Sequence, residues 1–131
     1  MNPDGKAELI VEGEKLNSPN GVLLKGNNLI IASSEGNSLL SLNLETNELT
    51  TLVGSGLGHA DGIIPLEGDR YLISSWTGEV YFVNSDFQTQ TLLNTSEADI
   101  NAADIAYVPQ DSLLVVPTFY DNRLMSYKVN Y

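Results

Sequence analysis

The chain has 131 residues, which suits one globular domain, and its 17 acidic against 6 basic side chains give a formal net charge of -11. This charge argues against binding to nucleic acid or to a membrane surface, because both are polyanionic. The sequence has no cysteine, which excludes disulfides and thiolate zinc sites, and its single histidine, His59, leaves oxygen atoms as the main ligands for any metal. We expect a soluble protein without a signal peptide in this chain, since no apolar stretch approaches the roughly 18 residues of a membrane span. Export of a longer parent protein stays open.

Short apolar runs separated by Gly, Asn, Asp and Pro recur along the chain, and helical periodicity is almost absent. The apolar run at 29–33 returns at 71–75 and again at 113–117. A period of about 40 residues with four short strands in each unit is typical of a β-propeller. The sequence therefore predicts an all-β fold, a β-propeller with three four-stranded blades at about 18–58, 59–99 and 100–131.

Each unit has the same order of parts. It opens with Asn-Gly, Asp-Gly or Asp-Ile, at Asn20, Asp61 and Asp104, and continues into a first strand. The apolar second strand follows, and then a third strand at 39–42, 80–83 and 124–127. Gly and Asn in the connecting turns provide the positive φ that tight hairpins require. A more polar fourth strand at 49–52 and 90–93 suits an outer edge in contact with water.

The third unit ends after its third strand, whereas residues 6–11 have the form of a fourth strand. Three blades cannot close a ring, because propellers have about four to eight, and open blades would expose apolar faces. One explanation is a two-fold homodimer with six blades, in which residues 6–11 of each subunit complete the third blade of the other. The alternative is the C-terminal half of a longer six-bladed propeller, whose partner is the missing N-terminal half.

Three motifs carry a family resemblance: SPNGV at Ser18–Val22, ADGI at Ala60–Ile63, and ADIAYVP with LLVVPTFYDNRLMSYKV within Ala103–Val129. With them the chain resembles the C-terminal half of the SMP-30/gluconolactonase/LRE-like six-bladed propellers, which are similar to NHL-repeat and strictosidine-synthase-like propellers. The resemblance implies one divalent cation at the mouth of the central channel and hydrolysis of small lactones or phosphoesters.

The resemblance also implies roles for two residues. Asn20 matches the family's Asn that coordinates metal and substrate, and Asp61 matches its Asp, which is a metal ligand and candidate general base. The family's further ligand, a Glu from an N-terminal blade, has no counterpart in this chain. The site is therefore incomplete, or a second subunit completes it.

The repeats themselves also indicate a site. Asn20, Asp61 and Asp104 occupy the same position in their units, so a propeller would place them at one end of its central channel. Their oxygen atoms suit Ca²⁺, Mg²⁺ or Mn²⁺. The alternative is that Asn or Asp before Gly forms a local turn, with its side chain bonded to nearby backbone.

Three further residues are candidates for binding substrate near the same mouth. His59 lies two residues before Asp61 and is a candidate ligand or proton shuttle; the alternative is an ordinary loop histidine. Trp76 and Tyr120 follow the second strands of their units and could stack on a sugar-like or apolar ligand. Aromatic residues in such places also pack between blades.

These observations leave two functions open. The first is a propeller that binds a small molecule and a divalent cation, with lactone or ester hydrolysis in which Asp61 activates water and Asn20 orients the substrate. The second is a non-catalytic, self-assembling half-propeller or interaction scaffold. No organic cofactor is expected, because the glycine-rich run at 54–58 follows a polar strand and precedes no helix.

Overall fold

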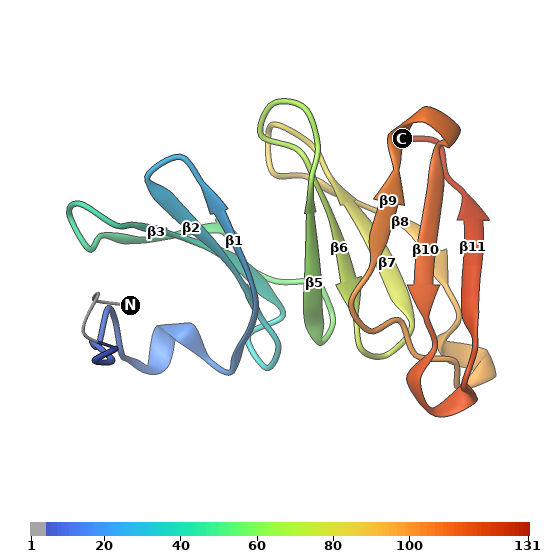
Figure 1. Ribbon diagram of the computed structural model, residues 1–131, viewed down its shortest axis with the longest axis horizontal. Helices are drawn as coiled ribbons and strands as arrows, with labels where there is room; N and C mark the ends of the chain where they lie inside the picture. The colour runs from blue at the N-terminus through green and yellow to red at the C-terminus, as the bar shows by residue number, and fades with distance from the viewer. Residues whose placement is uncertain (1–4) are drawn as a thin grey trace.

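The computed structural model describes residues 5–131, in which eleven strands form three antiparallel sheets and no α-helix occurs (Figure 1). The first sheet contains β1 (Pro19–Lys25), β2 (Asn28–Ser33), β3 (Ser38–Asn43) and β4 (Leu49–Val53). The second contains β5 (Ala60–Pro65), β6 (Tyr71–Ser75), β7 (Glu79–Val83) and β8 (Thr89–Asn94). The third contains β9 (Ala106–Val108), β10 (Leu113–Pro117) and β11 (Leu124–Lys128). Four short 3-10 turns are η1 (Glu14–Leu16), η2 (Ser96–Ala98), η3 (Pro109–Asp111) and η4 (Phe119–Asp121).

The all-β fold and the repeated order of strands confirm the prediction from the sequence. Each sheet is an up-and-down meander, and the three apolar runs that recur along the chain are β2, β6 and β10. The third sheet has three strands within the described residues, and β11 forms its outer edge. None of the helices in residues 5–131 is long and apolar enough to cross a membrane.

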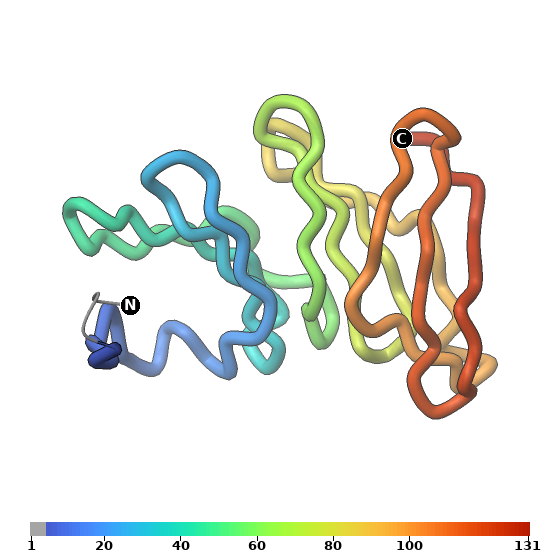
Figure 2. The backbone as a smooth tube through the Cα atoms, in the orientation of Figure 1, coloured from blue at the N-terminus to red at the C-terminus, as the bar shows by residue number. Residues whose placement is uncertain are grey.

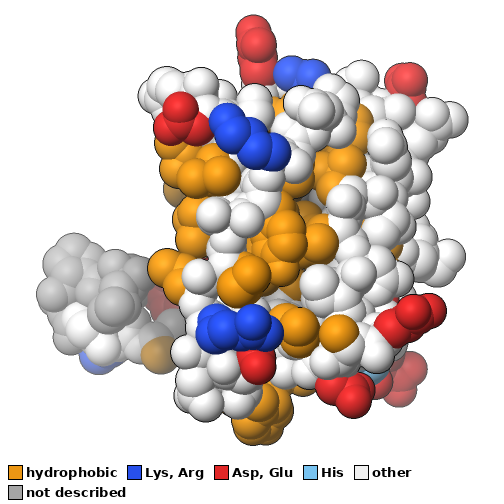
Figure 3. Space-filling model, turned by 90° about the vertical axis from the view of Figure 1, so that its right-hand side faces the viewer, with side chains coloured by type: hydrophobic (Ala, Val, Ile, Leu, Met, Phe, Trp, Pro, Cys, Tyr) orange, Lys and Arg blue, Asp and Glu red, His pale blue; other side chains and the backbone are white. Residues whose placement is uncertain are grey.

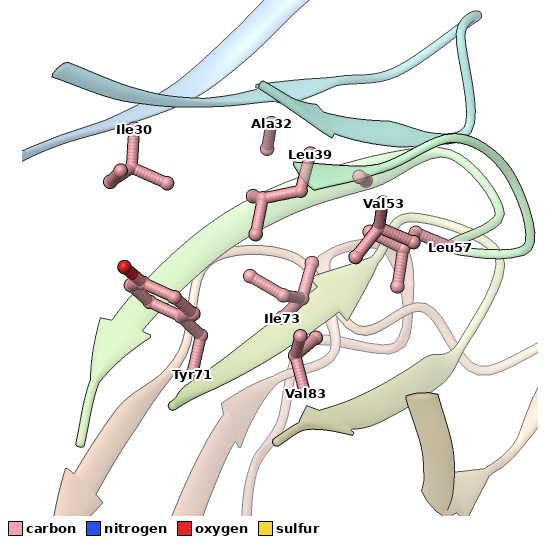
Figure 4. Close-up of a cluster of buried hydrophobic side chains, with 9 residues drawn as sticks. Ile30, Ala32, Leu39, Val53, Leu57, Tyr71, Ile73 and Val83 are labelled. Carbon is pink, nitrogen blue, oxygen red and sulfur yellow. The ribbon is translucent and has the colours of Figure 1, made fainter. Parts of the chain in front are cut away.

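The middle sheet is buried on both faces, and every residue of its second strand, β6, is buried. One core lies between the first and second sheets, where Leu39, Ile73 and Val83 are fully buried (Figure 4). The other core lies between the second and third sheets and includes Leu72 and Leu114, also fully buried. Because side chains alternate along a strand, neighbouring residues of β6 enter different cores.

The N-terminal segment forms no strand within a single chain. Residues 5–12 contain no strand and run along the far side of the first sheet (Figure 2). Val11 and Leu16 pack there against a small cluster formed by Ile31, Leu40 and Leu42. Within one chain the third sheet lies at the other end of the molecule, so residues 6–11 have no edge strand with which to pair. Their pairing with the third sheet of a second copy stays a prediction.

The two ends of the molecule expose apolar side chains. On the outward face of the third sheet, Val115 and Pro117 are half-buried and Leu124 is 70% exposed, and apolar side chains gather over this end in Figure 3. On the first sheet, Val22 and Leu24 of β1 are 62% and 65% exposed. Each end sheet therefore has one face in the core and another, partly apolar face that no other sheet covers.

Candidate functional site

The three repeat-equivalent polar residues lie at the starting ends of the innermost strands, toward the lower edge of Figure 1. In β1 and β5 the pairing register shifts between Pro19 and Val22 and between Ala60 and Ile63. The Asn20-Gly21 and Asp61-Gly62 pairs thus lie inside strands, at β-bulges, rather than in turns before them. Bulges of this kind redirect side chains and are frequent beside active sites.

Two glycines allow the innermost strands to approach each other. A Cβ atom on Gly21 would lie 1.8 Å from the backbone oxygen of Asp61, and one on Gly62 would lie 2.4 Å from Oδ1 of Asp104. Neither glycine has a positive φ, so glycine is needed here because a side chain would not fit, and not because of the backbone conformation. Each glycine therefore brings its sheet against the acidic residue of the next sheet.

This approach gathers Asn20, Asp61 and Asp104 around one pocket of about 420 Å³. The Asn20 and Asp104 residues are exposed, and Asp61 is half-buried. The rest of the lining consists of neighbouring residues of the innermost strands: Gly21, Val22, Gly62, Ile63, Ile64 and Ile105. The structure therefore brings together the three residues that the repeats predict to converge.

The electrostatics of the pocket centre on Asp61. Burial and, second, the negative charge of Asp104 raise the pKa of the Asp61 carboxyl above its ordinary value. Nearby, the buried hydroxyl of Ser74 accepts a hydrogen bond from the Gly62 N–H at 2.8 Å, which fixes the bulge. The repeat pattern does not single out Ser74, because its role depends on the bulge opposite it.

The alternative, in which the side chain is bonded to nearby backbone, applies to Asp104 among the three residues. Asp104 Oδ1 accepts a hydrogen bond from the Ile105 N–H at 3.0 Å, as that alternative predicts. Within residues 5–131 the side chains of Asn20 and Asp61 make no hydrogen bond. Their oxygen atoms are therefore free to contact a ligand in the pocket.

The oxygen atoms of Asn20, Asp61 and Asp104 are of the kind that a hard divalent cation prefers, but three side chains are too few to fill its coordination shell. Two carboxylates and one amide provide oxygen ligands only, which Ca²⁺, Mg²⁺ and Mn²⁺ prefer. In the described part of the chain, no group of three or more His, Asp or Glu residues is arranged to hold a metal. A complete ligand set would need additional residues, water or substrate.

The His59 side chain is not part of this pocket's lining. Its Nδ1 lies 3.7 Å from Oε1 of Glu35, and both side chains are exposed. The His59 backbone oxygen accepts a hydrogen bond from the Trp76 N–H at 2.8 Å, which joins the crossover to the β6–β7 turn. A role for His59 as ligand or proton shuttle stays a prediction.

Trp76 and Tyr120 line a second pocket of about 410 Å³, which we call the aromatic pocket. Its other lining residues are Thr77, Ser96, Asp99 and Asn101. It shares no lining residue with the pocket of Asn20, Asp61 and Asp104. Phe119 contacts both aromatic rings and was missed by the sequence reasoning. Its place beside Tyr120, directly after a second strand, is the signal that could have identified it.

No protein-family model and no curated protein sequence matches the chain. Solved structures are similar to it in fold. Virginiamycin B lyase from Staphylococcus aureus superposes with a TM-score of 0.61 at 10% identity, over 88% of this chain and 43% of that one. A chain of the nidogen/laminin complex gives a TM-score of 0.66 at 15% identity, over 84% and 44%.

The computationally designed Ika4 protein gives a TM-score of 0.58 at 10% identity, over 86% of this chain and 66% of that one. The chain spans about two fifths of the length of the lyase and nidogen/laminin chains that it matches. At these identities the comparisons establish the fold, and the narrower resemblance to SMP-30-like enzymes stays a prediction. The three sheets and these structural neighbours together show that the chain has a β-propeller fold.

Proposed function

We propose that the chain is half of a six-bladed propeller ring, which a second copy completes, and that the ring binds a small molecule together with a divalent cation. The observation that carries the binding site is the pocket shared by Asn20, Asp61 and Asp104. There, burial and a neighbouring carboxylate raise the pKa of Asp61. A cation would relieve the repulsion between the two carboxylates.

The two open ends of the molecule support closure of the ring. The first sheet exposes Val22 and Leu24, and the third sheet exposes Leu124 beside half-buried Val115. Burying each end against the opposite end of a second copy would remove both apolar faces from water. Residues 6–11 lie at the end of the molecule where the partner's third sheet would pack, beside its unpaired β11 edge.

The chemistry that suits this pocket is hydrolysis of a lactone or a similar ester. A bound cation would polarise the carbonyl of the substrate. The Asp61 carboxylate would take a proton of the attacking water as the water oxygen bonds to the carbonyl carbon. The ester C–O bond would then break, and Asp61 would return this proton to the leaving alkoxide oxygen. Asp61 would thus act as the general base, and the Asn20 amide would orient the substrate.

The test is calorimetric titration of the protein with Ca²⁺, Mg²⁺ and Mn²⁺, together with an assay on small lactones. Asp61→Ala should weaken cation binding by at least about tenfold, because it removes one of two carboxylates. It should also abolish lactone turnover while leaving the oligomer intact. The matched control is Asp86→Ala, which removes an exposed carboxylate in the β7–β8 turn, at the opposite end of the strands. Equal cation binding by Asp61→Ala and the unmodified chain would contradict the proposed site.

The second candidate is a non-catalytic scaffold. It is favoured by the small number of charged ligands, since the described residues of one chain offer no group of three or more His, Asp or Glu side chains that could hold a metal. A chain that forms the ring but binds none of the three cations and turns over no lactone would support this candidate.

A further inference from the structure

The aromatic pocket is built from the turns of two different sheets. Trp76 comes from the β6–β7 turn, and Phe119 and Tyr120 come from η4 between β10 and β11. The ring centroid of Phe119 lies 4.8 Å from that of Trp76 and 4.8 Å from that of Tyr120, both edge to face. The centroids of Trp76 and Tyr120 lie 6.1 Å apart at an interplanar angle of 79°.

These rings are exposed to an extent that folding does not explain. Tyr120 is 75% exposed and Phe119 is 56% exposed, so neither is packed between sheets. Phe119 also has a φ of +50°, a left-handed conformation that costs a bulky residue free energy. Phe119 contacts the rings of Trp76 and Tyr120, which lie at nearly right angles to each other; Trp76 is half-buried.

The polar groups of the pocket determine what kind of ligand suits it. Thr77 Oγ1 donates a hydrogen bond to Glu79 at 2.6 Å, and Ser96 Oγ donates one to Asn94 at 2.6 Å. Asn101 Nδ2 donates to the Trp76 backbone oxygen at 2.8 Å. Within residues 5–131 the carboxylate of Asp99 makes no hydrogen bond. The pocket therefore offers a ligand the free carboxylate of Asp99, aromatic rings, and two donors without a hydrogen bond in residues 5–131, the Trp76 indole N–H and the Tyr120 hydroxyl.

This inventory suits an organic cation. Such a cation needs a counter-charge and aromatic rings, and the pocket provides both. Asp99 is the charged residue among those lining the pocket, and the chain carries a net charge of -11. Arg123, which follows the aromatic turn, is paired with Asp121 and does not neutralise Asp99.

We propose that the aromatic pocket binds an organic cation, an alkylammonium or quaternary ammonium group. The cation would lie against the faces of Trp76 and Tyr120, and Asp99 would provide the counter-charge. Phe119 is a positioning residue that braces the other two rings. This site is separate from the pocket of Asn20, Asp61 and Asp104, so the inference does not rest on the proposed cation site or on hydrolysis.

The experiment uses Trp76, the single tryptophan of the chain, as its reporter. Fluorescence is recorded at constant ionic strength while choline chloride is added, and again with 3,3-dimethylbutan-1-ol, the uncharged molecule of the same shape. We expect choline to change the emission in a saturable way and the alcohol to leave it unchanged. An equal response to both probes, or no saturable response to choline, would overturn the proposal.

Two variants test the residues, with calorimetry as a second readout that does not depend on tryptophan emission. Tyr120→Ala and Asp99→Asn should each weaken choline binding about threefold to tenfold, in line with cation–π and partly screened ionic interactions. Both side chains are exposed, so these changes should leave folding intact. The control Asp86→Asn, which makes the same charge change in the β7–β8 turn, should bind choline as the unmodified chain does. Unchanged affinity in both test variants would also overturn the proposal.

Discussion

Gly21 and Gly62 show how the sequence positions the candidate site at the scale of single residues. Each occupies a place where the next sheet leaves no room for a Cβ atom. The Asn-Gly and Asp-Gly pairs therefore combine a polar side chain that faces the pocket with a glycine that allows the neighbouring strand to approach. For the same reason, Asp61 lies close to Gly21 and Asp104 lies close to Gly62.

Gly21→Ala should destabilise the chain by about 3 kcal/mol, because the new Cβ would overlap with the Asp61 backbone oxygen, which cannot swing away. Chemical denaturation measures this loss. The control is Gly54→Ala, whose Cβ would lie 3.9 Å from Thr51 Cγ2, an ordinary contact, and which should change the free energy of unfolding by less than about 0.5 kcal/mol. Equal effects of the two substitutions would show that the innermost strands do not approach as described.

The raised pKa of Asp61 predicts a particular dependence of stability on pH. Burial and the Asp104 charge make the folded chain hold the Asp61 proton more tightly than the unfolded chain does, so ionised Asp61 lowers stability above its folded pKa. Asp61→Asn should therefore be more stable than the unmodified chain at pH 7. This advantage should shrink as the pH falls through the folded pKa and vanish below the ordinary value of 3.8.

Urea denaturation at several pH values measures the difference between Asp61→Asn and the unmodified chain. Asp104→Asn should narrow the gap, since it removes the second cause of the shift. A constant advantage of Asp61→Asn at every pH would mean that the charge of Asp61 is not its source.

The convergence of Asn20, Asp61 and Asp104 could be predicted from the sequence, because equivalent positions in a repeat take equivalent positions in space. The need for glycine at position 21 could not be predicted in this way, because it depends on a close approach between residues of two different sheets. The sequence also did not separate the aromatic pocket from the first one. From the sequence, Trp76, Tyr120 and Asp61 were all expected near one channel mouth. The structure shows that Trp76 and Tyr120 line a separate pocket, where Phe119 contacts Trp76.

At the scale of elements, buried hydroxyl groups hold the turns that carry the aromatic residues. Thr118 is fully buried at the end of β10, where its Oγ1 donates to the Arg123 backbone oxygen and accepts from the Arg123 N–H, both at 3.0 Å. These bonds close the loop that contains Phe119 and Tyr120. Ser33 has a related role at the end of β2, where its Oγ contacts the backbone oxygens of Leu16 and Asn17 at 2.8 Å.

Thr118→Val, which keeps the shape of the side chain and removes both hydrogen bonds, should cost about 1–3 kcal/mol. It should also speed amide hydrogen exchange in 119–123, because the loop loses two of the hydrogen bonds that close it. Thr91→Val on the exposed strand β8 is the control and should leave both measurements nearly unchanged. Unaltered exchange in 119–123 would show that other contacts hold the loop.

The sequence predicted the apolar second strands well, because consecutive apolar residues such as Tyr71–Ile73 of β6 fit a strand that is buried on both faces. Residues 6–11 form no strand in a single chain, and their predicted pairing with a second copy stays a prediction. A strand at an edge depends on hydrogen bonds from a neighbour, and the local sequence does not say whether that neighbour is present.

At the scale of the whole molecule, the two end sheets are the features that call for a partner. Each packs one face into a core and leaves the other partly apolar, with Val22 and Leu24 at one end and Leu124 at the other. The repeat count predicted this imbalance, since three blades do not close a ring. What covers the two ends depends on an assembly, and a single sequence does not specify the assembly.

The measurement that tests the central claim most directly is the mass in solution by light scattering. Closure of the ring predicts twice the 14.2 kDa mass of the chain. Leu124→Lys, which places a charge on the outward face of the third sheet, should shift the protein to the single-chain mass, whereas Thr91→Lys on exposed β8 should leave the dimer intact. A compact monomer for the unmodified chain would contradict the account, because the half-propeller would then be stable with both end faces in water.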